Sequence, residues 1–168
     1  MADKKIPVAM LDGTCQWVDS KDAAALAGLA KLPYGEKEFA GAIYQRPDGK
    51  FCYSTAVPGT RDDFVFATDP AAGKLAGLFH THHGGQENEF SPGDVKTAEG
   101  LRQTSYIRGN ESGDVRRYEP GVDRPVRNER RRDSVISGSK AMGTLVGNLS
   151  RREALEAAYD LHNPPTAP

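Results

Sequence analysis

Residues 77–94, GLFHTHHGGQENEFSPGD, join an apolar run that ends in spaced histidines to a polar loop and then to a serine and Asp94. Side chains alternate between the faces of a strand, so the sequence predicts that His80 and His82 point one way and Thr81 the other. Two imidazoles on one face can converge on one metal ion. Asp94 can add a third ligand if the following helix folds back across the strand end.

The same stretch also has a purely structural interpretation. Ser91, Pro92 and Asp94 form a capping-box-like pattern with proline at the first helical position, which predicts a helix over 91–103. A His-x-His pair alone occurs often by chance. The two interpretations are compatible, because a residue that caps a helix can also face a metal site.

Composition describes an ordinary globular chain. It has 168 residues, a net charge of −1 and 27% charged side chains, which gives no general attraction to nucleic acid or anionic membranes. No apolar run approaches the roughly 18 residues of a membrane-spanning helix, and the N-terminus has no secretory signal. We therefore expect a cytoplasmic protein, or one exported by a route that needs no signal peptide.

The cysteines are too few for a disulfide framework. Cys15 and Cys52 have neither CxxC spacing nor further cysteines beside them. We therefore expect two free thiols, which suit a reducing compartment.

Periodicity along the chain predicts an α+β fold with a mixed, largely antiparallel sheet flanked by helices. A helix is expected over 20–33, where Ser20 can cap and Pro33 prevents continuation. Two β-rich runs, 38–45 and 50–57, are split by an RPDG turn and predict a hairpin. Further strands are expected over 63–68 and 74–82, with a second hairpin over 105–120.

The C-terminal third changes character. Residues 120–138 combine two prolines with the run NERRRD, which predicts a linker or arm. Arg130, Arg131 and Arg132 could bind an anionic partner, but the interspersed acidic residues disfavour nucleic acid. A last helix is expected over 150–163, before a proline-rich tail. The expected plan is a lead-in over 1–19, a main domain over 20–119, the arm, and a C-terminal segment over 139–168.

Three spaced pieces together resemble the JAMM motif of the JAB/MPN metalloprotease family: HTH at 80–82, SPGD at 91–94 and EFAGAIY at 38–44. The motif has His-x-His, a spacer of about seven residues, Ser-x-x-Asp and a distant upstream glutamate. The likeness covers about residues 20–119 and is greatest to a bacterial domain found at the C-terminal ends of Rhs-type polymorphic toxins. Two features depart from the motif: the spacer has eight residues, and His83 adds an imidazole.

The resemblance implies a JAB/MPN-like fold and zinc-dependent hydrolysis of a peptide or isopeptide amide. His80, His82 and Asp94 would then be zinc ligands, Glu38 the general acid/base, and Ser91 a hydrogen-bond donor to the developing oxyanion. It also implies a protein or peptide substrate and, for a toxin domain, a cognate inhibitor or immunity protein.

Alternatives remain at each point. Glu38 could be a solvated residue at a strand start, and His83, Gly84 and Gly85 could form a surface loop, an orienting contact or a lid. The alternative function is a non-catalytic JAB-like module that binds a protein partner. A third is a nuclease-like effector whose arginine arm holds nucleic acid. The complete set of Glu, His, His, Ser and Asp favours the enzyme.

Overall fold

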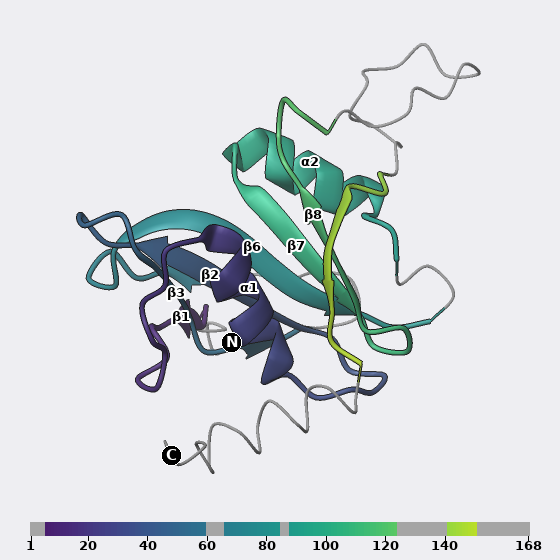
Figure 1. Ribbon diagram of the computed structural model, residues 1–168, viewed down its shortest axis with the longest axis horizontal. Helices are drawn as coiled ribbons and strands as arrows, with labels where there is room; N and C mark the ends of the chain where they lie inside the picture. Colours follow the sequence, from purple (N-terminus) through teal and green to yellow (C-terminus); the bar gives the residue numbers. More distant parts are fainter. Residues whose placement is uncertain (1–5, 60–65, 85–87, 124–140, 151–168) are drawn as a thin grey trace, which may run out of the picture.

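The α+β class is confirmed by a computed structural model that describes residues 6–59, 66–84, 88–123 and 141–150. Within these residues, two ten-residue helices cover a mixed sheet (Figure 1). Neither helix is long and apolar enough to cross a membrane.

The main sheet has seven strands in the part of the chain that is described. Six follow one another in the order β3 (Phe51–Tyr53), β2 (Phe39–Gln45), β6 (Lys74–His82), β7 (Thr104–Gly109), β8 (Asp114–Tyr118) and β9 (Thr144–Asn148), and β4 (Val57–Pro58) also pairs with β2. β6 and β7 are parallel, whereas the other neighbouring pairs are antiparallel. A parallel pair needs a crossover connection, and α2 (Pro92–Leu101) lies within it.

Both predicted hairpins are present. β2 and β3 pair across the turn at 46–49, where Gly49 adopts a φ of +86° that other residues rarely adopt. β7 and β8 pair across 110–113. The expected strand over 63–68 is described only from Phe66, and its last two residues form β5 (Ala67–Thr68). β5 pairs with β1 (Val8–Ala9) in a separate two-stranded sheet.

The helices lie on opposite faces of the main sheet. α1 (Lys21–Ala30) follows its capping residue Ser20, and α2 follows Ser91, both as predicted. α1 packs in a cluster with Tyr106, whereas α2 packs with Ile107, the next residue of β7. The helices cover both faces of β7, which is entirely buried. β2 is almost entirely buried because its face away from α1 packs with β1 instead. Packing on the α1 face is tight enough that a Cβ at Gly41 would overlap the Phe79 ring.

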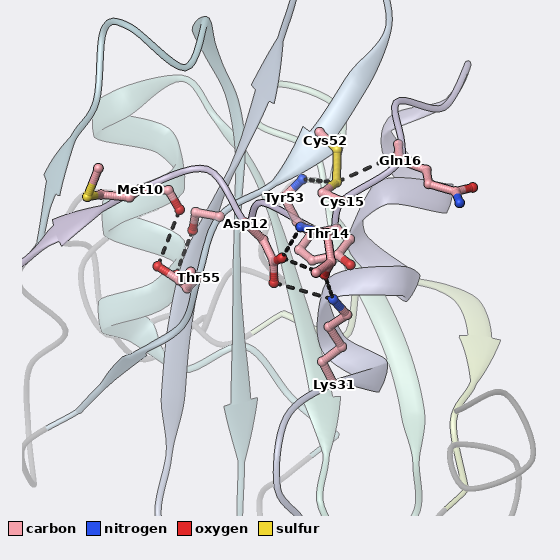
Figure 2. A network of polar contacts seen from close by, with 10 residues as sticks. Met10, Asp12, Thr14, Cys15, Gln16, Lys31, Cys52, Tyr53 and Thr55 are labelled. Carbon is pink, nitrogen blue, oxygen red and sulfur yellow. Dashed lines mark hydrogen bonds and ion pairs between the residues drawn. A yellow bond between two sulfur atoms is a disulfide. The ribbon is translucent and has the colours of Figure 1, made fainter. Parts of the chain in front are cut away.

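A disulfide attaches the N-terminal lead-in to β3, so the expectation of two free thiols is wrong. Cys15 and Cys52 are 37 positions apart in sequence, but their Cα atoms lie 6.0 Å apart (Figure 2). Sequence spacing could not reveal this pair, because disulfide formation depends on separation in space. Disulfides persist in oxidising compartments, so the cysteines no longer argue for a reducing one.

Hydrogen bonds beside the disulfide anchor the same segment (Figure 2). The Asp12 carboxylate accepts bonds from the backbone N–H and the hydroxyl of Thr14, and it pairs with Lys31 near the end of α1 at 3.4 Å. The backbone N–H of Asp12 donates to the Tyr53 carbonyl in β3. These contacts attach the expected lead-in to both α1 and the sheet.

β9 was not predicted in the 139–168 segment. Its sequence, TLVGN, is short and contains glycine, so its strand conformation depends on pairing with β8 more than on local preference. Arg130, Arg131 and Arg132, with most of the expected arm, lie outside the described residues, as does the expected C-terminal helix beyond Ser150.

Candidate metal centre

Three side chains meet at the end of β6. His80 and His82 project from one face of the strand, as predicted, and their Nε2 atoms lie 2.7 Å apart. Asp94 approaches from the first turn of α2, with Oδ1 3.2 Å from His80 Nε2 and Oδ2 3.1 Å from His82 Nε2. One ligand atom of each residue lies within 4.8 Å of the others. The three residues predicted as ligands are therefore brought together.

The cap of α2 holds Asp94 in place. The Asp94 N–H donates to Ser91 Oγ at 3.1 Å, and the Ser91 N–H donates to Asp94 Oδ2 at 2.9 Å, which completes a capping box. The carboxylate is thus fixed by the helix start while it faces both imidazoles. The structural and the metal interpretations of SPGD apply to the same residues.

The site is mostly shielded from water, and its charges are coupled. The side chains of His80, His82 and Asp94 are 9%, 12% and 18% exposed. Burial alone would raise the pKa of the Asp94 carboxyl, but the two imidazoles hold that pKa well below its ordinary value. Burial alone would lower the pKa of His80, but the Asp94 and Glu38 carboxylates raise it above its ordinary value. Protons therefore compete with a metal ion for His80.

Glu38 lies beside this group, just before β2. Ala40 pairs with His80 in the β2–β6 ladder, so continuing the antiparallel register brings Glu38 opposite His82. Residues opposite each other in a ladder point to the same face. The carboxylate is also close enough to raise the pKa of His80. The expected general acid/base thus comes from a strand distant in sequence to the edge of the ligand group.

His83 contacts Glu38 and is outside the group of three ligand candidates. Its Nδ1 lies 3.1 Å from Glu38 Oε1. Gly84 follows with a φ of +85°, which lets the chain turn at the end of β6. Gly85 lies outside the described residues, so a lid in this loop stays a prediction.

Two supporting residues were not identified from the sequence. Thr81, between the two histidines, points to the α1 face, and its Oγ1 accepts a bond of 3.0 Å from the Phe39 N–H. Asn110, in the β7–β8 turn, donates its backbone N–H to the His82 carbonyl at 2.8 Å. Both partners are distant in sequence, so no local pattern could have indicated them.

The ligand geometry suits a divalent ion. Zinc lies about 2.0–2.2 Å from histidine nitrogen and carboxylate oxygen, so two ligands of a tetrahedral site are about 3.3 Å apart. His80 Nε2 lies 3.2 Å from Asp94 Oδ1 and His82 Nε2 lies 3.1 Å from Asp94 Oδ2, so each imidazole is close to this value from a different oxygen of the carboxylate. The 2.7 Å between the two Nε2 atoms is shorter. Three protein ligands leave a fourth position for water or substrate, as in catalytic zinc sites.

A comparison of the chain with protein-family models, with curated proteins and with solved structures finds no match. A functional assignment therefore depends on the residues of the site and on the motif that they form.

Proposed function

We propose that the chain is a zinc-dependent hydrolase of the JAMM type that cleaves a peptide or isopeptide amide. The observation that carries this proposal is the convergence of His80, His82 and Asp94 on one point beside Glu38. These residues come from three separate segments of the chain. Their meeting supports the motif resemblance, which was based on sequence order alone.

Zinc is proposed over iron because of the residues around the ligands. Two histidines and one carboxylate also suit Fe(II) in oxygenases. A carboxylate and a capping serine beside the ligand group, however, match the needs of hydrolysis: a proton acceptor and a donor to the oxyanion. When bound, zinc would supply a water of lowered pKa and polarise the scissile carbonyl.

The chain's own residues would transfer the proton and stabilise the developing negative charge. The Glu38 carboxylate, which is 30% exposed, would take the proton of the attacking water and pass it to the leaving amine. Ser91 Oγ accepts the Asp94 N–H, so its hydroxyl proton is left to donate to the developing oxyanion. The low exposure of the two histidines limits competing water at the reacting bond.

The resemblance to polymorphic-toxin domains supports a more specific proposal. The substrate would be a protein or peptide, and the chain would act as a bacterial effector that a cognate inhibitor or immunity protein restrains. Its location would then be the cytoplasm or, after export, a target compartment.

Metal content tests the proposal first. Protein purified without a metal-binding tag would be supplied with zinc, dialysed and measured by elemental mass spectrometry, beside His82→Ala and Asp94→Asn. We expect about one zinc per chain in the wild type and a large loss in both variants. Asp94→Asn tests the charge alone, because an asparagine oxygen can still accept the Ser91 N–H of the capping box while the negative charge is lost.

Hydrolysis of peptide and isopeptide amides would then be compared between the wild type and Glu38→Gln. Loss of turnover with zinc retained is expected from the variant. A wild type that binds no zinc would refute the metal site. Zinc binding without hydrolysis of either amide class would favour the non-catalytic binding module.

A further inference from the structure

The Glu38 main chain is fixed on both sides, whereas its side chain has several rotatable bonds. The Glu38 carbonyl accepts a bond of 2.9 Å from the Gly59 N–H, and the next residue, Phe39, donates its N–H to Thr81. The position from which the carboxylate starts is therefore set by the sheet. These backbone contacts do not fix the orientation of the two carboxylate oxygens. A general base is effective only when one of its oxygens lies within hydrogen-bond reach of the proton that it removes.

Within the described residues, His83 is the one side chain that hydrogen-bonds to the Glu38 carboxylate. Its Nδ1 lies 3.1 Å from Oε1, and Nδ1 must be the donor because an ionised carboxylate only accepts. His83 directly follows His82, whose carbonyl is held by the Asn110 N–H. The imidazole thus follows directly after the hydrogen-bonded strand end that carries the two candidate ligands.

We propose that His83 is a positioning residue that holds Glu38 Oε1 and so directs Oε2 toward the attacking water. This inference rests on the proposed hydrolase function. It assigns a role to the imidazole that departs from the family motif, and that role is distinct from metal ligation, because His83 lies outside the group of convergent ligand atoms. Both side chains are substantially exposed, 45% for His83 and 30% for Glu38, so the contact is poorly placed to stabilise the fold.

Three substitutions separate orientation from other roles. His83→Ala removes the donor. His83→Asn keeps a donor at the same distance from the backbone, because the asparagine Nδ2 and the histidine Nδ1 are both attached to Cγ. His83→Gln carries its donor one bond further out and is the matched control. If His83 orients Glu38, His83→Ala should lower kcat. His83→Asn should have a kcat close to that of the wild type, and His83→Gln should have a lower kcat than His83→Asn.

A first readout requires no activity. Long-range nitrogen–proton NMR spectra of histidine-labelled, zinc-loaded protein, recorded at mildly alkaline pH, report which ring nitrogen carries the proton. We expect the Nδ1–H tautomer at His83 in the wild type and the Nε2–H tautomer, the usual form of a free imidazole, in Glu38→Ala. An Nε2–H tautomer in the wild type would overturn the proposal.

The second readout is kinetic, with the amide substrate that the wild type cleaves. His83→Ala should lower kcat about tenfold, a part of the roughly 10²–10⁴-fold that a positioned base contributes, with KM and zinc content unchanged. An unchanged kcat would overturn the positioning role while the hydrolase function stands. A raised KM alone would indicate that His83 binds the substrate, and a loss of zinc would indicate that His83 is a metal ligand. Either result would overturn the positioning role as well. A wild type that cleaves neither amide class would overturn the hydrolase function and the positioning role with it.

Discussion

Breaking the Cys15–Cys52 bond should lower the free energy of unfolding by about 4 kcal/mol. The bond closes a loop across 37 positions. For such a loop the chain-entropy relation gives a loss of about 13 cal/mol/K from the unfolded state, or about 3.8 kcal/mol at 25 °C. Domains typically unfold with about 5–15 kcal/mol, so the bond would account for a large fraction of the stability.

Urea denaturation of four proteins measures this effect: the oxidised wild type, Cys15→Ala, Cys52→Ala and the double variant. Either single substitution removes the same bond, so the double variant should be scarcely less stable than Cys52→Ala alone. Cys52 is fully buried, so its variants carry an additional packing loss. Reduced wild type provides a comparison without any substitution, and it should match Cys15→Ala.

Two results would refute the reasoning. Reaction of two thiols per chain with a thiol reagent, in denatured protein that was never reduced, would show that the bond does not form. Additive losses in the two single variants would show that the cysteines contribute separately.

The remaining predictions concern the site and the sheet beneath it. Glu38→Gln should retain zinc but lose about 10²–10⁴-fold in kcat, measured with the substrate of the wild type. Because the pKa of His80 is raised in the metal-free protein and zinc must displace its proton, zinc affinity measured by calorimetry should increase with pH until that pKa is passed and then level off. Ser91→Ala should lower the free energy of unfolding by about 1 kcal/mol through the lost helix cap, whereas Ser91→Thr should keep most of the stabilisation that the cap provides. Gly41→Ala should destabilise by about 1–3 kcal/mol in urea titrations, since its Cβ would overlap the Phe79 ring.

The features predicted well are those decided over a few neighbouring residues. Ser20 and Ser91 cap the two helices because their hydroxyls reach backbone N–H groups within one turn. The turn at 46–49 joins β2 and β3 because proline, aspartate and glycine favour its backbone angles. The shared face of His80 and His82 follows from strand alternation alone.

The features that were missed or mistaken depend on residues distant in sequence. β9 is a strand because β8 offers it an unpaired edge, and its own five residues carry little signal. Cys15 meets Cys52 because the lead-in runs antiparallel beside β3. The contact of His83 with Glu38 arises where the start of β2 lies beside the end of β6.

By itself, the sequence determined the local pieces of this protein: the caps, the turns, the strand that ends in His-Thr-His and the residue types from which a metal site can be made. Only the tertiary structure decided that Asp94 returns to meet both imidazoles, that Glu38 arrives beside them and that His83 turns to Glu38 instead of to the ligand group. The physical reason is the difference in sequence distance over which these interactions act. Helix caps, turns and strand alternation act within a few residues, whereas ligand convergence requires β2 to pair with β6 and α2 to pack on the sheet.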